Sequence, residues 1–448
     1  MISITHLLST CIDACSRGCQ VIRFVDNQRK QSQSQSQSSS SSSCNTSTTS
    51  SAVNQEVMNV TYKVANDPRS ALTEADVASQ RVILYCLRSV WGDELNIIGE
   101  EDSNDDDDDN NNNNNNNSNN NDDENICTDE QVFQKYNIKL PQEEAIQSNL
   151  CPIMMTTTTT TTTNDNKDIM VEISDLTLYI DPMDGTREFV EGRLDNVQCL
   201  IGITWKGQPI GGVIGLPFLW NDNGMIDQTF VVSGLYWKEA SFVKTVCIQH
   251  HNNTAIAPPS TLSTSTIATQ STHNKNYNEL LSSLGSNNND SNHNNILNVY
   301  TGDSDRIHKK HALQYLESWI PNNNINNDNN DPSTILNLCI VGGCGNKILR
   351  TLATGLDTND GNALSIITPG TCSWDTAAPT AILLAATQSF GKQGKITDMF
   401  GGALVYDSSG KNVTNDLGAL ISIGPIACSY HNKLCERFHG DSSLFTST

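Results

Sequence analysis

The chain has 448 residues and a formal net charge of −23, from 50 acidic and 27 basic side chains. Its length predicts two or three domains. The charge argues against nucleic acid as a partner, because no basic stripe is available to replace the counterions of a phosphate backbone.

Several tracts have too little sequence complexity to form part of a core. Such segments bury too little apolar surface to offset a backbone entropy cost of ~1–2 kcal/mol per residue, so we predict disordered inserts. The inserts cover residues 31–55, 103–168, about 250–295 and 321–333, and they include an Asp/Asn run at 103–125 and an unbroken Thr run at 156–163. The roughly 300 residues that remain suffice for a two-domain enzyme.

The N-terminal residues predict an amphipathic helix. Apolar residues from Ile4 to Cys19 follow helical spacing, and charged side chains such as Asp13 and Arg17 interrupt any apolar run, unlike in a signal peptide. No apolar stretch approaches the ~20 residues of a membrane span. The 14 cysteines include no CxxC pair or zinc-type cluster, which favours a reducing compartment. We therefore expect a cytoplasmic protein without a membrane partner.

The first helix with a candidate functional residue begins at Thr73 and runs to about Trp91. Thr73 as N-cap and Asp76 three residues later form an arrangement like a capping box, worth about 1 kcal/mol. Taken alone, these residues favour a capping role for Asp76 over a catalytic one.

Two predicted strands end in acidic residues. Ile97 and Ile98 lead into Glu100, which is the first acid of a run that merges with the acidic insert. Exposed acidic runs are usually solvated, so only Glu100 is taken as a ligand for a hard divalent ion.

The second acidic turn follows the apolar strand that begins at Leu176. Apolar and other residues alternate up to Ile180, and Pro182 and Gly185 are then expected to force the chain out of the sheet. Asp181 and Asp184 would lie at the strand's carboxyl end, where open α/β sheets bind ligands. Backbone N–H groups near Gly185 could receive a phosphate oxygen.

The next segments predict scaffold. Residues 196–204 read as a strand, Lys206 and Gly207 as a hairpin turn, and residues 210–216 as the returning strand. Residues 336–341 read as a buried strand that enters a glycine-rich turn at 342–345 and then a short helix.

That helix carries Lys347 and is expected to stop at Gly355. The turn before it matches neither a Walker loop nor a dinucleotide fingerprint. A lone match of this kind more often reflects tight packing of a helix on a sheet, although such a turn can approach a phosphate. Asp375 begins a helix running from Ala377 to about Gln388, where the helix dipole favours an acid by ~0.3–1 kcal/mol.

Taken in order, these motifs resemble the magnesium-dependent, lithium-sensitive phosphatase superfamily that includes inositol monophosphatase and fructose-1,6-bisphosphatase. The segments that carry this resemblance are Asn96–Asp102, Ile180–Thr186 and Trp374–Pro379. Within the superfamily the chain is most similar to the 3′(2′),5′-bisphosphate nucleotidases. That similarity rests on Thr186–Gly192, Leu194–Asn196 and Val341–Lys347.

The resemblance implies an αβαβα layered sandwich, with an N-terminal α+β half over residues 1–220 and a C-terminal α/β half over residues 221–448. It implies two or three Mg²⁺ per site and inhibition by Li⁺. The implied metal ligands are Glu100, Asp181, the Met183 carbonyl, Asp184 and Asp375.

The resemblance also assigns catalytic and substrate-binding roles. Asp76 would work with Thr186 to deprotonate the attacking water, which reverses the capping interpretation or adds to it. The implied substrate contacts are Gly185, Thr186, Ser304, His308, Gly343, Lys347 and Asp375. The segment from Tyr300 to His308 departs from the family in spacing and adds Asp303 and Asp305.

The implied reaction is hydrolysis of the 3′-phosphate of 3′-phosphoadenosine 5′-phosphate to AMP and phosphate, and of 3′-phosphoadenylyl sulfate, in sulfur metabolism. The alternatives are an inositol polyphosphate 1-phosphatase or inositol monophosphatase, and an inactive binding or scaffold homologue. The last alternative predicts a missing ligand, and none is missing from the sequence.

Overall fold

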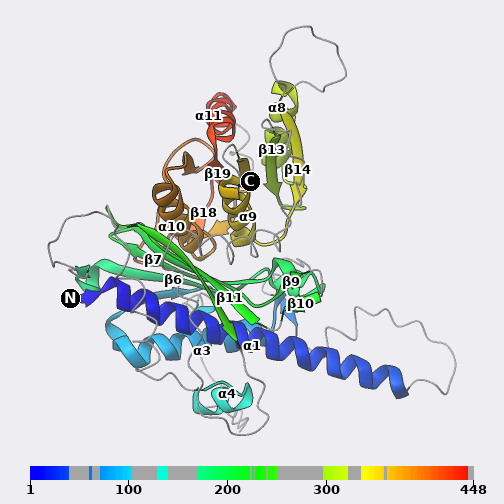
Figure 1. Cartoon of the computed structure of the whole chain (residues 1–448), viewed down its shortest axis with the longest axis vertical. Coiled ribbons are helices and arrows are strands. Elements are labelled where there is room, and N and C mark those ends of the chain that lie inside the picture. Colours follow the sequence, from blue (N-terminus) through cyan, green and yellow to red (C-terminus); the bar gives the residue numbers. More distant parts are fainter. Residues whose placement is uncertain are drawn as a thin grey trace, which may run out of the picture.

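The computed structural model describes residues 1–39, 60–62, 71–102, 129–139, 169–221, 224–226, 228–238, 241–249, 296–320, 334–357 and 361–441. The described elements form five layers in the order helix, sheet, helix, sheet, helix (Figure 1). This arrangement confirms the predicted αβαβα sandwich. The low-complexity inserts lie outside the described residues, apart from residues 31–39 and 129–139. Residues 129–139 lie within the insert predicted at 103–168, and they correct that prediction, because they form a short helix and turn whose Val132 and Phe133 are buried in the core.

The first layer consists of α1 (Ile4–Ser39) and α3 (Glu74–Trp91), with the short α4 (Asp129–Lys135) beside α3. The apolar face of α1 is buried against the first sheet, as its periodicity predicts. The helix also continues through residues 31–39, which corrects the prediction that disorder starts at residue 31. Gln is a good helix former, and extending a helix costs much less than nucleating one.

The first sheet has six strands in the order β12-β11-β8-β7-β6-β4. All neighbours are antiparallel except β4 and β6, which are parallel. The strands are β4 (Asn96–Gly99), β6 (Leu176–Asp184), β7 (Gln198–Trp205), β8 (Gln208–Leu216), β11 (Gln228–Leu235) and β12 (Phe242–Gln249). Lys206 and Gly207 form the predicted hairpin turn, with φ angles of 51° and 73°. This sheet continues to Gln249 and so extends past the predicted domain boundary at residue 220.

The middle layer contains α9 (Cys344–Asp357) and α10 (Ser373–Phe390). A helix between two sheets must be apolar on nearly all sides, and most residues of α10 are buried. Three glycines, Gly202, Gly212 and Gly234, form a row across β7, β8 and β11 under this helix. A Cβ atom at Gly212 would lie 2.2 Å from the Ala378 carbonyl oxygen. The row therefore lets α10 approach the sheet closely.

The second sheet has the order β14-β13-β15-β19-β17, with β13, β14 and β15 parallel. The strands are β13 (Ile296–Thr301), β14 (Ile335–Ile340), β15 (Asn362–Ile367), β17 (Gly394–Thr397) and β19 (Ala419–Ile423). The outer layer is formed by α8 (Ile307–Trp319) and α11 (Pro425–Gly440). Two-residue and three-residue ladders complete the described strands: β1 (Ile2–Ser3) with β5 (Met170–Val171), β2 (Thr61–Tyr62) with β3 (Ala71–Leu72), β9 (Leu219–Asn221) with β10 (Gly224–Ile226), and β16 (Thr371–Cys372) with β18 (Thr414–Asn415).

Two predictions about this half are wrong. β14 is an edge strand of the second sheet rather than a buried one, and Leu338 and Ile340 are about half exposed. Gly355 lies inside α9, which continues to Asp357, and does not end the helix. A Cβ atom at Gly355 would lie 2.4 Å from Ile423, which explains why this residue is a glycine. This glycine serves close packing of the helix on β19. Among the described helices, none combines the length and apolarity needed to cross a membrane.

Candidate metal and phosphate site

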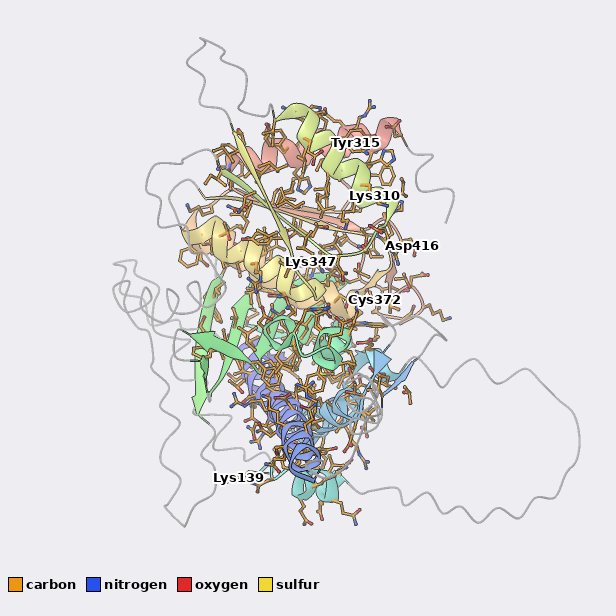
Figure 2. The ribbon with its side chains drawn as sticks, turned by 90° about the vertical axis from the view of Figure 1, so that its right-hand side faces the viewer. Lys139, Lys310, Tyr315, Lys347, Cys372 and Asp416 are labelled. Carbon is orange, nitrogen blue, oxygen red and sulfur yellow. The ribbon has the colours of Figure 1, made fainter. Side chains whose placement is uncertain are left out.

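The site lies where strand ends from the two sheets meet. β4 and β6 are parallel, and Gly99 pairs with Ile180, so Glu100 and Asp181 follow at the same edge of the first sheet. The loops after the parallel strands β13, β14 and β15 come together at the facing edge of the second sheet. Figure 2 shows Lys347 and Cys372 in this middle region and Tyr315 far from it. The pocket between these edges has a volume of about 400 Å³.

A cluster of three aspartates forms one wall of the pocket. Asp181, Asp184 and Asp375 each place a carboxylate oxygen within 4.8 Å of the others, and Glu100 lines the same pocket. Residues three apart on a regular strand point to opposite faces, but β6 has an irregular register between Asp181 and Asp184. The strand also continues through Pro182, which corrects the prediction that it ends there. This irregularity brings both acids into one site.

The carboxylates carry more negative charge than the described residues compensate. Burial raises the pKa of Asp181 well above its usual value, and Glu100, Asp184 and Asp375 raise it further. Burial and Asp184 raise the pKa of Asp375 to about 8. The pKa of Asp184 is raised less, to about 6, because Lys347 and two backbone N–H groups oppose the effect of burial.

Clustered hard oxygen donors of this kind fit Mg²⁺, which takes carboxylates and carbonyls from separate loops. The Met183 carbonyl lies between the two β6 aspartates in the chain and accepts a hydrogen bond from the Thr186 hydroxyl at 3.1 Å. The predicted ligand set is therefore gathered at one place by β6, the first turn of α10 and the turn after β4. Its role as a metal site remains a prediction.

The glycine-rich turn holds one of these acids. The backbone N–H of Cys344 donates to one Asp184 oxygen at 2.9 Å, and that of Gly345 donates to the other at 2.7 Å. Gly343 has φ +68°, and a Cβ atom there would lie 3.0 Å from Asp184. The positive end of α9 is therefore directed to a carboxylate of the protein. Gly343 and Lys347 still line the pocket, and the Lys347 amine donates to the Gly343 carbonyl at 2.6 Å.

The two oxygens of Asp76 have different partners, so its position is compatible with both of the roles considered for it. One oxygen accepts from the backbone N–H and the hydroxyl of Thr73, both at 2.7 Å, which completes the predicted capping box. The other accepts from the Thr186 hydroxyl at 2.7 Å. Burial raises the pKa of Asp76 to about 7, while these hydrogen bonds oppose the rise.

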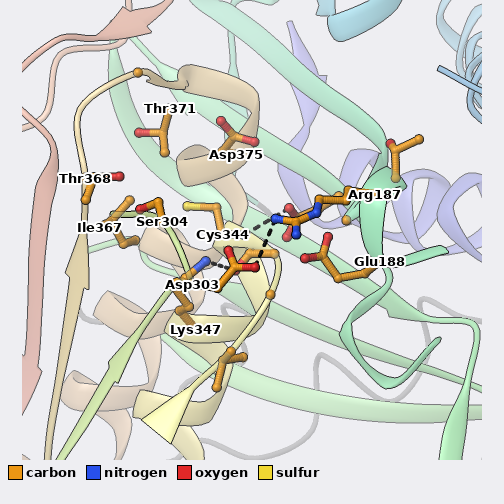
Figure 3. Close-up of a pocket in the computed structure, with 18 of the residues that line it drawn as sticks. Arg187, Glu188, Asp303, Ser304, Cys344, Lys347, Ile367, Thr368, Thr371 and Asp375 are labelled. Atoms are coloured by element: carbon orange, nitrogen blue, oxygen red, sulfur yellow. Dashed lines mark hydrogen bonds and ion pairs between the residues drawn. The ribbon is translucent and has the colours of Figure 1, made fainter. Parts of the chain in front are cut away.

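Asp375 also combines a capping position with a place in the cluster. Its carboxylate accepts from the backbone N–H of Cys372 at the start of α10. The same side chain lines the pocket (Figure 3) and lies in the cluster with the β6 acids. The helix-dipole explanation and the proposed ligand role are therefore compatible.

The predicted substrate contacts are not all at the pocket. Gly185, Thr186 and Ser304 line it, but His308 is 2% exposed within α8 and is not among its lining residues. Several other lining residues were not predicted as site residues: Arg187, Glu188, Arg306, Gly342, Cys344 and residues 366–371. Four of them had a usable signal, because they lie in segments that carry the family resemblance: Arg187, Glu188, Gly342 and Cys344.

The comparisons with known proteins agree on one family. A sequence profile of the Inositol monophosphatase family matches residues 49–433. The 3′(2′),5′-bisphosphate nucleotidase 1 of Dictyostelium discoideum is 30% identical over 181 residues, which are 40% of this chain and 45% of the relative. The enzyme of the same name from Mus musculus is 26% identical over 253 residues, covering 56% and 59%. The chain thus matches about half the length of these relatives.

Among solved structures, the extragenic suppressor protein suhB from Bartonella henselae is similar to this chain with a TM-score of 0.43 and 12% identity. The match covers 95% of this chain and 96% of that protein.

Proposed function

This chain belongs to the inositol monophosphatase family, and we propose that it is a Mg²⁺-dependent phosphatase for the 3′-phosphate of 3′-phosphoadenosine 5′-phosphate. The products are AMP and phosphate, and 3′-phosphoadenylyl sulfate is a second substrate of the same kind. The observation that carries the proposal is the Asp181, Asp184 and Asp375 cluster beside the Thr186–Asp76 hydrogen bond. The named relatives favour the nucleotide over other phosphate esters.

In the proposed mechanism, Glu100, Asp181, the Met183 carbonyl, Asp184 and Asp375 hold two or three Mg²⁺. Bound Mg²⁺ supplies positive charge that lowers the pKa of a nearby water and neutralises the phosphate. Competition between Mg²⁺ and Li⁺ is expected at these ligands.

The protein groups move the proton. The Thr186 hydroxyl donates to Asp76, so its oxygen can accept a proton from the attacking water while its own proton passes to the carboxylate. A pKa of about 7 suits Asp76 to this task near neutral pH. The water oxygen forms a bond to phosphorus as the bond between phosphorus and the ribose 3′ oxygen breaks, and the ribose oxygen takes up a proton from solvent. We assign to Lys347 the phosphate that stays on the product.

The cytoplasm is our proposed location. The cysteines in the described part of the chain are free thiols, and that state suits a reducing compartment.

A panel of phosphate esters tests the proposal. With Mg²⁺ present, we expect kcat/KM to be highest for 3′-phosphoadenosine 5′-phosphate and lower for inositol 1,4-bisphosphate and inositol 1-phosphate. Asp375→Asn serves as the matched control, since it should lose turnover of every substrate. Faster turnover of an inositol phosphate would assign the second candidate function, which the family match favours. No turnover of any ester would support the inactive homologue.

A further inference from the structure

An ion pair crosses the pocket between the two halves of the molecule. Arg187 belongs to α6 (Thr186–Val190), which follows the acidic turn of the first sheet. Its guanidinium lies 3.0 Å from the carboxylate of Asp303, in the loop after β13 of the second sheet. Figure 3 shows the two side chains pointing toward each other. Both residues line the pocket.

The contacts of the three cations in the pocket differ. Arg306 donates to the Pro369 carbonyl, and Lys347 donates to the Gly343 carbonyl and lies near Asp184. Arg306 is therefore held by its own half of the molecule, whereas Lys347 is held by its own half and also lies near an acid of the other half. Arg187 instead bonds to Glu191 on its own helix at 2.8 Å and reaches the opposite half only through Asp303.

The Arg187–Asp303 contact is a weak one. The side chains are 27% and 52% exposed, and exposed ion pairs contribute little because water screens them. A phosphate group offers more negative charge and can accept two parallel hydrogen bonds from a guanidinium. An incoming phosphate could therefore replace the Asp303 carboxylate on Arg187 with a net gain.

The position of Arg187 indicates whether it would bind the reacting phosphate or a second phosphate of the substrate. The preceding residue, Thr186, directs its hydroxyl to Asp76 beside the acidic cluster, where we place the reacting phosphate. Arg187 points instead toward the Asp303 loop, and Lys347 approaches the same loop at Gly302. Two cations from different halves thus meet at this loop: Arg187 reaches it through Asp303, and Lys347 lies between it and the acidic cluster.

We propose that Arg187 binds the second phosphate of a doubly phosphorylated substrate, the one that is not cleaved, and that Asp303 competes with that phosphate for the guanidinium. The pair then sets selectivity for bisphosphates over monophosphates. Arg187 is a specificity residue, and Asp303 weakens binding of any ligand that must displace it. This inference rests on the proposed function, since it concerns the same pocket.

The test compares two nucleotides that differ only in the second phosphate, 3′-phosphoadenosine 5′-phosphate and adenosine 3′-phosphate. Arg187→Met should lower the ratio of their kcat/KM values by about tenfold to a hundredfold, the usual size of a lost charged hydrogen bond. The ratio for Arg187→Lys should lie between those of Arg187→Met and wild type. Lysine keeps the positive charge but lacks the paired N–H donors of the guanidinium. Asp303→Asn should lower the KM for the bisphosphate by about two- to fivefold.

Asp305 provides the matched control. It lies two residues after Asp303, is 92% exposed, contacts Lys310 at 3.8 Å and does not line the pocket. Asp305→Asn removes the same charge from the same loop and should leave the KM for the bisphosphate within about twofold. Equal effects of the Asp303 and Asp305 changes would show a general charge effect and overturn the inference.

The other outcomes separate this inference from the proposed function. If Arg187→Met lowers kcat/KM equally for both nucleotides, Arg187 does not recognise the second phosphate and the inference is wrong. If the wild-type protein hydrolyses neither nucleotide, the proposed function is wrong. The same variants are then compared on inositol 1,4-bisphosphate and inositol 1-phosphate. If Arg187→Met leaves the ratio of the two kcat/KM values unchanged, the inference is wrong.

Discussion

The two oxygens of Asp76 allow its structural and catalytic roles to be measured separately. Thr73→Ala removes the capping hydroxyl and should lower the free energy of unfolding by about 1 kcal/mol. It also raises the pKa of Asp76, but it leaves the Thr186 hydroxyl in place, so kcat should fall far less than in Thr186→Val. Thr186→Val removes the hydroxyl that faces the other oxygen and should lower kcat by ~10²–10⁴. Loss of that hydrogen bond also raises the pKa of Asp76, because the bond opposes the effect of burial. Asp76→Asn should lower both kcat and the free energy of unfolding.

The assay measures kcat with saturating Mg²⁺, together with unfolding in denaturant, for the three single variants and for Asp76→Asn with Thr186→Val. Two groups that act as one unit should give a double variant scarcely slower than either single. Losses in kcat that multiply would show that Thr186 and Asp76 act independently. Asp76 would then be a helix cap only, and the base would have to be another residue near Glu100.

Three further predictions follow from the acidic cluster and the glycine row. Asp184→Asn should abolish Mg²⁺-dependent turnover. It should also lower the free energy of unfolding by about 1–3 kcal/mol, because an amide group cannot accept hydrogen bonds from both Cys344 and Gly345. Near-normal activity of this variant at low Mg²⁺ would contradict the assignment of Asp184 as a metal ligand. Without metal, the raised pKa values of Asp184 and Asp375 mean that these acids stay protonated in the folded chain at pH values where they are ionised in the unfolded chain. The free energy of unfolding should therefore fall as the pH rises from 5 to 8. Mg²⁺ should therefore raise the Tm more at pH 8 than at pH 5 in thermal scans against EDTA, and an equal rise at both pH values would speak against Mg²⁺ binding there. Gly212→Ala should lower the free energy of unfolding by about 1–3 kcal/mol or more, because the new Cβ atom pushes α10 away from the sheet. Gly440→Ala is the control: nothing lies within 4 Å of its new Cβ atom, so the free energy of unfolding, measured in the same denaturant titration, should change little.

Local sequence predicted the features that depend on neighbouring residues. The capping box at Thr73, the hairpin turn at Lys206 and the acids at the carboxyl ends of β4 and β6 each depend on residues within a few positions of the chain. Such contacts follow from periodicity, cap residues and turn residues alone. The five-layer fold was instead implied by the family resemblance, since periodicity does not fix which sheet a helix covers.

The errors arose where tertiary packing decides the outcome. An apolar run such as β14 has the same pattern whether it lies inside a sheet or at its edge. Gly355 has the residue type of a helix C-cap, but its close neighbour is Ile423, which is far away in the sequence. His308 was placed by resemblance in a segment whose spacing departs from the family, and the structure buries it in α8.

The role of the glycine-rich turn has a consequence for phosphate binding. Its backbone N–H groups at Cys344 and Gly345 are donated to Asp184, so the positive end of α9 stabilises a protein carboxylate. This fixes both oxygens of an acid that must be ionised to bind a cation, and it lowers the pKa that burial has raised. Because these donors are engaged, charge for the substrate has to come from metal ions and from side chains such as Arg187 and Lys347. We therefore expect a pocket lined by six carboxylates and three cationic side chains to bind the proposed doubly phosphorylated substrate only after divalent cations have bound.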